Sequence, residues 1–259
     1  MSNQSIGIFD SGIGGTSIFK EVNTLLPNEN IIYLADSKNA PYGDKSKDAI
    51  LQLSIKNVEL LIRNKCKLII VACNTATTNS ISYLRKTYDI PFVGIEPAIK
   101  PASLNSKSKS IGILATKGTL SSDLFHKTSD LYTKDVSVIE RVGEGLVPLI
   151  EAGKIDSLEV NELLRKFLTP MIEAQIDYLV LGCTHYPYLI PQLKQILPEN
   201  VSIIDSGLAV AKQTKNILQF NRLLNANLNQ PKIKFYSNGD TTILKNILDG
   251  KFQVNALDF

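Results

Sequence analysis

The chain of 259 residues contains no tryptophan, two histidines and three cysteines. So few cysteines, and an odd number of them, do not make a disulfide framework, so we expect free thiols in a reducing compartment. No cationic segment followed by an apolar stretch opens the sequence, so no secretory signal is visible. The longest apolar runs are far shorter than the roughly 20 residues that span a bilayer. We therefore expect a cytoplasmic protein with no membrane partner.

The sequence also has little excess charge. Its net charge is +3, which is too small to indicate nucleic-acid binding. The densest group of lysines, between Lys100 and Lys109, lies in a serine-rich stretch that we interpret as a solvated linker. Apolar residues make up 44% and charged residues 20%, which is typical of a globular protein. A chain of this length can form one large or two smaller α/β domains, and we expect two.

Short apolar runs alternate with stretches of helical period, which predicts βαβ units and a mainly parallel sheet. Helices are expected over residues 48–64, 158–174 and 188–197. Strands are expected over residues 6–9, 30–35, 68–72, 92–95, 110–114, 136–140, 178–181, 202–205 and 232–236.

Two stretches of the chain, residues 67–75 and 177–185, resemble each other. In each, an apolar run of strand length is followed by a cysteine, Cys73 or Cys183, and then by polar residues. Residues 110–119 also echo residues 5–15. This repetition predicts two similar doubly wound α/β domains with mainly parallel sheets and the active site in the cleft between them. We expect residues 1–97 with 208–259 to form the first domain, and residues 98–207 the second.

The two repeated cysteines are candidates for catalysis. Free cysteine usually serves as a small buried apolar residue, and Cys66 fits that role. Cys73 and Cys183 each precede an expected helix start, where we expect a thiol pKa below the free value of about 8.5. Ligands bind at the carboxyl ends of strands in open α/β sheets, so both thiols are expected at one ligand site. Two thiols on opposite sides of a substrate suit inversion of a stereocentre.

Other polar residues accompany the cysteines. His185 lies two residues after Cys183 and could share its proton, as in a Cys/His thiol hydrolase. A zinc site is the competing interpretation, but no second pair of ligands completes it, so we predict no metal. Asp10 and a glycine-rich turn follow the first expected strand, where glycines let the backbone approach a ligand. From the pattern alone, the favoured interpretation of Asp10 is the N-cap of the following helix, and Glu151 is a glutamate at a helix end.

Four motifs together resemble the glutamate racemases, within the aspartate/glutamate racemase superfamily, across nearly the whole chain. They are Asp10-Ser11-Gly12-x-Gly14-Gly15, Pro41-Tyr42-Gly43, residues 72–77 (ACNTAT) and residues 181–187 (LGCTHYP). Aspartate-specific members of the superfamily typically lack the Asp-Ser-Gly start and have an acidic residue at the position of His185. The resemblance therefore favours glutamate.

The resemblance implies racemisation of L-glutamate and D-glutamate without a cofactor, which supplies D-glutamate for peptidoglycan. It implies that Cys73 is the base towards D-glutamate and Cys183 the base towards L-glutamate. Asp10 is expected to assist Cys73, while His185 and Glu151 assist Cys183. The other implied contacts are Ser11, Tyr42 and Gly43 to the side-chain carboxylate, Asn74, Thr75 and Thr184 to the α-carboxylate, and Thr116 and Thr119 near the ligand. Many relatives are dimers, so the resemblance allows a homodimer.

The residues leave other functions open. A related racemase or isomerase could act on aspartate, hydantoins or maleate. A thiol hydrolase would use Cys183 and His185 and leave Cys73 without a role, and a binding protein for acidic amino acids would need neither thiol. A pyridoxal enzyme would require a lysine for a Schiff base, and no lysine stands in a distinctive context.

Overall fold

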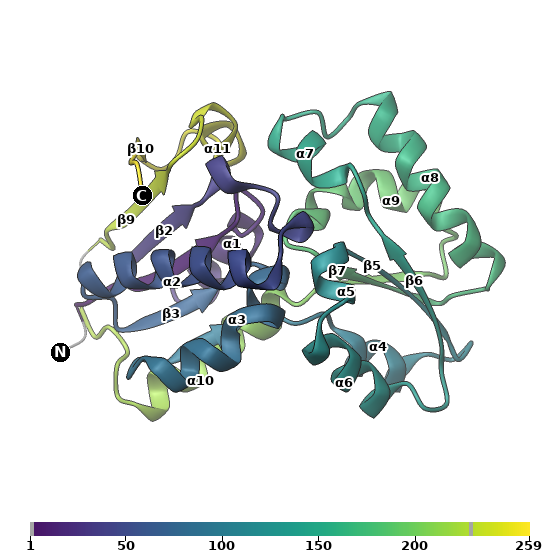
Figure 1. Ribbon diagram of the computed structural model, residues 1–259, viewed down its shortest axis with the longest axis horizontal. Helices are drawn as coiled ribbons and strands as arrows, with labels where there is room; N and C mark the ends of the chain where they lie inside the picture. The colour runs from purple at the N-terminus through teal and green to yellow at the C-terminus, as the bar shows by residue number, and fades with distance from the viewer. Residues whose placement is uncertain (1–2, 228–229) are drawn as a thin grey trace.

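The computed structural model describes residues 3–227 and 230–259, which form two lobes that each contain one parallel sheet (Figure 1). Sheet A has the strand order β10-β9-β2-β1-β3-β4, and sheet B has the order β6-β5-β7-β8. Sheet A contains β1 (Ile6–Asp10), β2 (Ile31–Ala35), β3 (Leu68–Val71), β4 (Phe92–Gly94), β9 (Ile233–Ser237) and β10 (Val254–Ala256). Sheet B contains β5 (Ser110–Ala115), β6 (Ser137–Val142), β7 (Tyr178–Gly182) and β8 (Ser202–Ile204).

The four strands β2-β1-β3-β4 of sheet A follow the same order along the chain as β6-β5-β7-β8 of sheet B. In sheet A, β2 and β3 lie on opposite sides of β1, and in sheet B, β6 and β7 lie on opposite sides of β5. The strand order therefore changes direction between β1 and β3 and between β5 and β7, and open α/β sheets bind ligands at such switch points. Cys73 follows β3 and Cys183 follows β7, which are the third strands of the two sets. The predicted fold class, two similar doubly wound parallel α/β units, is confirmed.

Helices cover both faces of the sheets. In the first lobe these are α1 (Thr16–Leu25), α2 (Lys47–Arg63), α3 (Asn74–Thr87), α10 (Gly207–Phe220) and α11 (Thr242–Ile247). In the second lobe they are α4 (Ile99–Asn105), α5 (Lys117–Leu120), α6 (Asp123–Tyr132), α7 (Leu146–Glu151), α8 (Leu158–Glu173) and α9 (Ile190–Ile196). The 3₁₀ turns are η1 (Ser37–Asn39), η2 (Tyr42–Asp44) and η3 (Tyr186–Leu189).

Successive side chains of β1 point to opposite faces of sheet A, and both faces are buried, which explains its continuous apolar run. Ile8 belongs to a core cluster with Phe19 and Val22 of α1, whereas Phe9 belongs to another with Leu61 of α2. A parallel strand that is covered on both faces must be apolar at every position, not at alternate ones. The first of these clusters also contains Leu179 of β7, so one buried core joins the two lobes.

Most expected strands and helices are present within one or two residues of the predicted bounds. The expected solvated linker between Lys100 and Lys109 is wrong in part, because α4 occupies Ile99–Asn105. Ile99 and Ala102 of this helix are fully buried, and Pro101 lies in the first turn, where its missing N–H is tolerated. The expected helix at 188–197 begins instead as η3 and continues as α9. The three residues of β10 were not predicted.

The end of the chain returns to the first lobe, where β9 pairs with β2 and α10 packs against α1. We propose the division into residues 1–97 with 208–259 and residues 98–207 as the two domains. No helix within residues 3–227 and 230–259 is long and apolar enough to cross a membrane.

Candidate active site

A small cavity lies where the carboxyl ends of both sheets meet. Its volume of about 10 Å³ leaves room for roughly one water molecule. The first lobe lines it with Ser11, Pro41, Tyr42, Gly43, Cys73, Asn74 and Thr75, and the second with Thr116, Val147, Cys183, Thr184 and His185. A larger hollow of about 570 Å³ beside β8 is lined by residues such as Ile190 and Ile203 and holds no cysteine or histidine. The smaller cavity is therefore the candidate site.

Cys73 stands at the start of α3, where its Sγ accepts a hydrogen bond from the Ala76 amide at 3.4 Å. The thiol itself donates to Ser11 Oγ at 3.6 Å. Burial, and then the nearby Asp10 carboxylate, raise the pKa of Cys73 well above its ordinary value. The expected lowering by the helix start is therefore wrong for Cys73, because desolvation of the thiolate outweighs the helix amides. In this closed site Cys73 carries its proton.

Asp10 ends β1 and is fully buried behind the cavity wall. Its carboxylate accepts from the Gly12 amide at 3.0 Å and from Thr184 Oγ1 at 3.2 Å, so it links the two lobes. Burial raises its pKa from 3.8 to about 6, with His185 acting in the opposite direction. The alternative in which Asp10 caps α1 is not observed, since Gly15 occupies that position.

Cys183, His185 and Glu151 form a chain of polar contacts. Cys183 Sγ lies 3.7 Å from His185 Nδ1, and His185 Nε2 lies 2.6 Å from Glu151 Oε1. Although burial acts to lower the pKa of His185, its contacts with Cys183 and Glu151 raise it well above 6.5. A protonated His185 donates from both ring nitrogens, so Cys183 Sγ is an acceptor in this state. Glu151 reaches across to the first lobe, where its Oε1 accepts from the Ile13 amide at 2.7 Å.

The turn after β1 consists largely of glycines because side chains of the second lobe occupy the space that a Cβ atom would need. A Cβ at Gly12 would lie 1.9 Å from Glu151 Oε1, and one at Gly14 would lie 2.3 Å from His185 Nδ1. The sequence predicted close approach of a ligand to these glycines, and the close approach is instead made by two candidate catalytic side chains.

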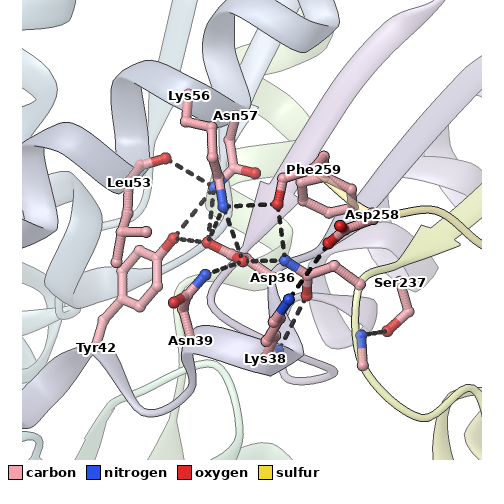
Figure 2. Close-up of polar contacts among 12 residues, drawn as sticks. Asp36, Lys38, Asn39, Tyr42, Leu53, Lys56, Asn57, Ser237, Asp258 and Phe259 are labelled. Carbon is pink, nitrogen blue, oxygen red and sulfur yellow. Dashed lines mark hydrogen bonds and ion pairs between the residues drawn. The ribbon is translucent and has the colours of Figure 1, made fainter.

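Tyr42 and Gly43 line the cavity at the 3₁₀ turn η2. The Tyr42 phenol donates its hydrogen bond to Asp36 at 2.5 Å, so it is not free to donate to a ligand (Figure 2). The first amides of a 3₁₀ turn have no partner within the turn, so the backbone is the part of η2 that is available to an anionic ligand.

Asn74 and Thr75 begin α3 at the cavity wall. Asn74 Nδ2 donates to the Ile95 carbonyl at 3.5 Å, and the buried Asn74 Oδ1 has no hydrogen-bond partner among residues 3–227 and 230–259. Thr75 Oγ1 lies 2.8 Å from Thr116 Oγ1 of the second lobe. Thr119 is fully buried 2.9 Å behind Thr116, so Thr116 faces the cavity and Thr119 supports it.

Comparison with known proteins identifies this arrangement. The family model for Asp/Glu/Hydantoin racemase matches residues 8–214. The chain belongs to the Asp/Glu/Hydantoin racemase family. A glutamate racemase of Herpetosiphon aurantiacus is 42% identical over 240 residues, which are 93% of this chain and 94% of that protein.

Solved structures of glutamate racemases share the whole fold. The isoform RacE1 from Bacillus anthracis is 32% identical, with a TM-score of 0.90, and the match covers 100% of this chain and 99% of that one. The Escherichia coli glutamate racemase, solved with L-glutamate and the activator UDP-MurNAc-ala, is 31% identical, with a TM-score of 0.86 and coverage of 98% and 97%. The predicted resemblance to glutamate racemases is confirmed.

In this racemase-family chain most of the predicted site residues lie around one cavity, whereas Asp10 and Glu151 lie behind its wall. Sequence reasoning missed Val147, an apolar residue of α7 that lines the cavity, and Ser37, whose Oγ donates to Glu151 at 3.4 Å. Neither residue carries a local signal. Within the described part of the chain, no three histidine, cysteine, aspartate or glutamate side chains group as metal ligands.

Proposed function

We propose that this chain is a glutamate racemase that uses two cysteines and no pyridoxal cofactor. One observation carries the proposal: Cys73 and Cys183 follow the third strands of two repeated sheets and line the same closed cavity. The family match and the names of the curated relatives support glutamate as the substrate.

The chemistry consists of two proton transfers. Cys183, which accepts from a protonated His185, takes the α-proton of L-glutamate, and the electron pair of the broken bond spreads into the α-carboxylate. Cys73 then gives its thiol proton to the opposite face, which yields D-glutamate and a Cys73 thiolate. The reverse direction exchanges the two roles. The raised pKa of Cys73 suits the donor role in the closed site.

The enzyme must stabilise the charge that develops on the α-carboxylate. A nearly dry cavity strengthens each hydrogen bond to that charge. We propose that Thr75 and Thr184 hold the α-carboxylate together with Asn74. The unpartnered Oδ1 of Asn74 is an acceptor, so it suits the α-ammonium of the same substrate. The amides of Tyr42 and Gly43, with Ser11, would hold the side-chain carboxylate.

The proposal extends to the setting of the enzyme. A cytoplasmic location agrees with two thiols that must stay reduced to act. The supply of D-glutamate for peptidoglycan and a homodimeric assembly follow from the resemblance to glutamate racemases.

The proposal is tested by incubating the pyridoxal-free protein with L-glutamate in D₂O, following optical rotation together with loss of the α-proton signal by NMR. We expect rotation to decay to zero while deuterium enters the α-position. Cys73→Ala and Cys183→Ala should each abolish racemisation, and Cys66→Ala, which changes a core thiol, should remain active.

Other outcomes would redirect the assignment. Full activity of either cysteine variant would contradict the two-base mechanism. Exchange with aspartate but not glutamate would indicate the related racemases. The contacts of Cys183, His185 and Glu151 also suit a thiol hydrolase, which predicts ester or amide cleavage that survives Cys73→Ala. Binding of glutamate without exchange would indicate a binding protein.

A further inference from the structure

A second polar cluster lies beside the cavity and centres on Asp36 (Figure 2). Asp36 follows β2, is fully buried and does not line the cavity. Its carboxylate accepts hydrogen bonds from Asn39 (2.7 Å), Tyr42 (2.5 Å), Lys56 (3.2 and 3.3 Å), Asn57 (3.4 Å) and Asn238 (2.5 Å). A buried carboxylate with this many donors is held in one place, and it holds each donor in turn.

The donors come from segments that are far apart in the sequence. Lys56 belongs to α2, and Asn238 follows β9. Both also donate to the main-chain oxygen of Phe259, at 3.0 and 3.2 Å, and the Lys56 ammonium lies 5.3 Å from the centre of the Phe259 ring. The cluster therefore ties the edge of sheet A to the loop that follows β2.

One member of the cluster also belongs to the candidate site. The Tyr42 hydroxyl donates to Asp36 and accepts from Asn57 Nδ2 at 3.1 Å, so both of its hydrogen-bonding directions are used. Burial, and then the Asp36 carboxylate, raise the pKa of Tyr42, so the phenol keeps the proton that it donates. With its ring fixed at this end, Tyr42 sets the position of the turn that carries its own amide and that of Gly43.

We propose that Asp36 is a positioning residue for the reaction: it holds Tyr42, and through Tyr42 the η2 backbone, in the place that receives the side-chain carboxylate of the substrate. This inference rests on the proposed function for the identity of that carboxylate. Lys56 supplies a positive charge next to Asp36, which reduces the repulsion between the buried carboxylate and an anionic substrate.

Asp36→Asn separates positioning from charge. If Asp36 acted only through its charge, its removal would weaken a repulsion and lower KM. Positioning predicts the opposite sign: KM for both glutamate enantiomers rises about ten-fold, the equivalent of one charge-assisted hydrogen bond, while kcat changes less. Because the effect passes through Tyr42, the double variant with Tyr42→Phe should resemble the single variants instead of multiplying their effects.

Glu29→Gln is the matched control. Glu29 is a second buried carboxylate of the first lobe, 2.6 Å from Lys67 and away from the cavity. This variant should lose thermal stability and keep the KM of the wild type. A fall in KM for Asp36→Asn, or a lowered Tm with an unchanged KM, would overturn the inference.

A measurement without substrate keeps the inference independent of the proposed function. Hydrogen exchange followed by mass spectrometry should show faster exchange of amides in residues 40–45 of Asp36→Asn than in wild type or Glu29→Gln. Unchanged exchange there would refute the positioning role. Failure of the wild-type protein to exchange the α-proton of glutamate would instead refute the proposed function.

Discussion

At the scale of single residues, burial determines the chemistry of the site. Desolvation is the largest cause of the raised pKa of both Asp10 and Cys73, and the Asp10 carboxylate raises the pKa of Cys73 further. Burying an ionised carboxylate lowers the stability of the folded protein. Active sites commonly contain such groups, because their chemistry requires them. Asp10 should therefore reduce stability while it supports the reaction.

Asp10→Asn tests this conflict. Burial raises the folded-state pKa of Asp10 from 3.8 to about 6, so between these values the unfolded chain has lost a proton that the folded chain keeps. Stability due to Asp10 is therefore fully present below about pH 4, falls as pH rises to about 6 and stays low above that. The variant should match wild type at about pH 4 and be more stable by up to ~3 kcal/mol above about pH 7.

Urea unfolding at several pH values measures that difference, and the racemisation rate measured on the same samples should fall. A stability difference that is independent of pH would contradict the assignment of the shift to Asp10.

At the scale of elements, side chains of the second lobe pack against the turn between β1 and α1. Gly12 leaves room for Glu151 of α7, and Gly14 leaves room for His185 of the segment after β7. This packing fixes the imidazole beside Cys183. In the proposed reaction, the turn would therefore act through His185, which packs on it.

Gly14→Ala should therefore displace His185, because the new Cβ would lie 2.3 Å from Nδ1. We expect kcat to fall at least 100-fold, since loss of a positioned acid–base partner typically has an effect of this order, while the fold persists. The matched change is Gly250→Ala, where φ is +65° and no described residue beyond the two chain neighbours has an atom within 4 Å of the new Cβ. It should lower stability by about 1 kcal/mol and leave kcat unchanged. Equal kcat in both variants would contradict the role of Gly14.

At the scale of the whole molecule, the cavity between the lobes is too narrow for the proposed substrate. An amino acid is several times larger than the roughly one water that fits, so the lobes or the segments that line the cavity must separate for substrate to enter. Contacts such as that between Thr75 and Thr116 cross this boundary and must open as well.

The three cysteines report this opening. A bulky thiol reagent should modify Cys73 and Cys183 only through the open form, and glutamate should slow both reactions about ten-fold by favouring the closed form. Cys66 is the internal control, since it is buried in the core of the first lobe and should not respond to glutamate. Peptide mapping by mass spectrometry gives the three rates. Equal protection of Cys66 would show that the reagent reports unfolding rather than opening.

The sequence alone could predict what depends on neighbours in the chain. Apolar runs of strand length, the repeated Cys73 and Cys183, and the glycines after Asp10 are local patterns, so they indicated the two α/β units and most of the cavity lining. The three residues of β10 and the helix α4 lacked a clear period because they are short, and packing against the rest of the protein stabilises them.

Only the tertiary structure decided which distant groups meet. Glu151 ends a helix and Asp36 follows a strand, and neither has a distinctive local sequence. In the structure, Glu151 contacts His185 and Asp36 accepts a hydrogen bond from Tyr42. The direction of the Cys73 pKa shift also depended on burial, which the expected helix start did not reveal. Local sequence determines which elements form and which side chains stand at their ends. Contacts between lobes, and the exclusion of water between them, arise only when segments far apart in the chain pack together.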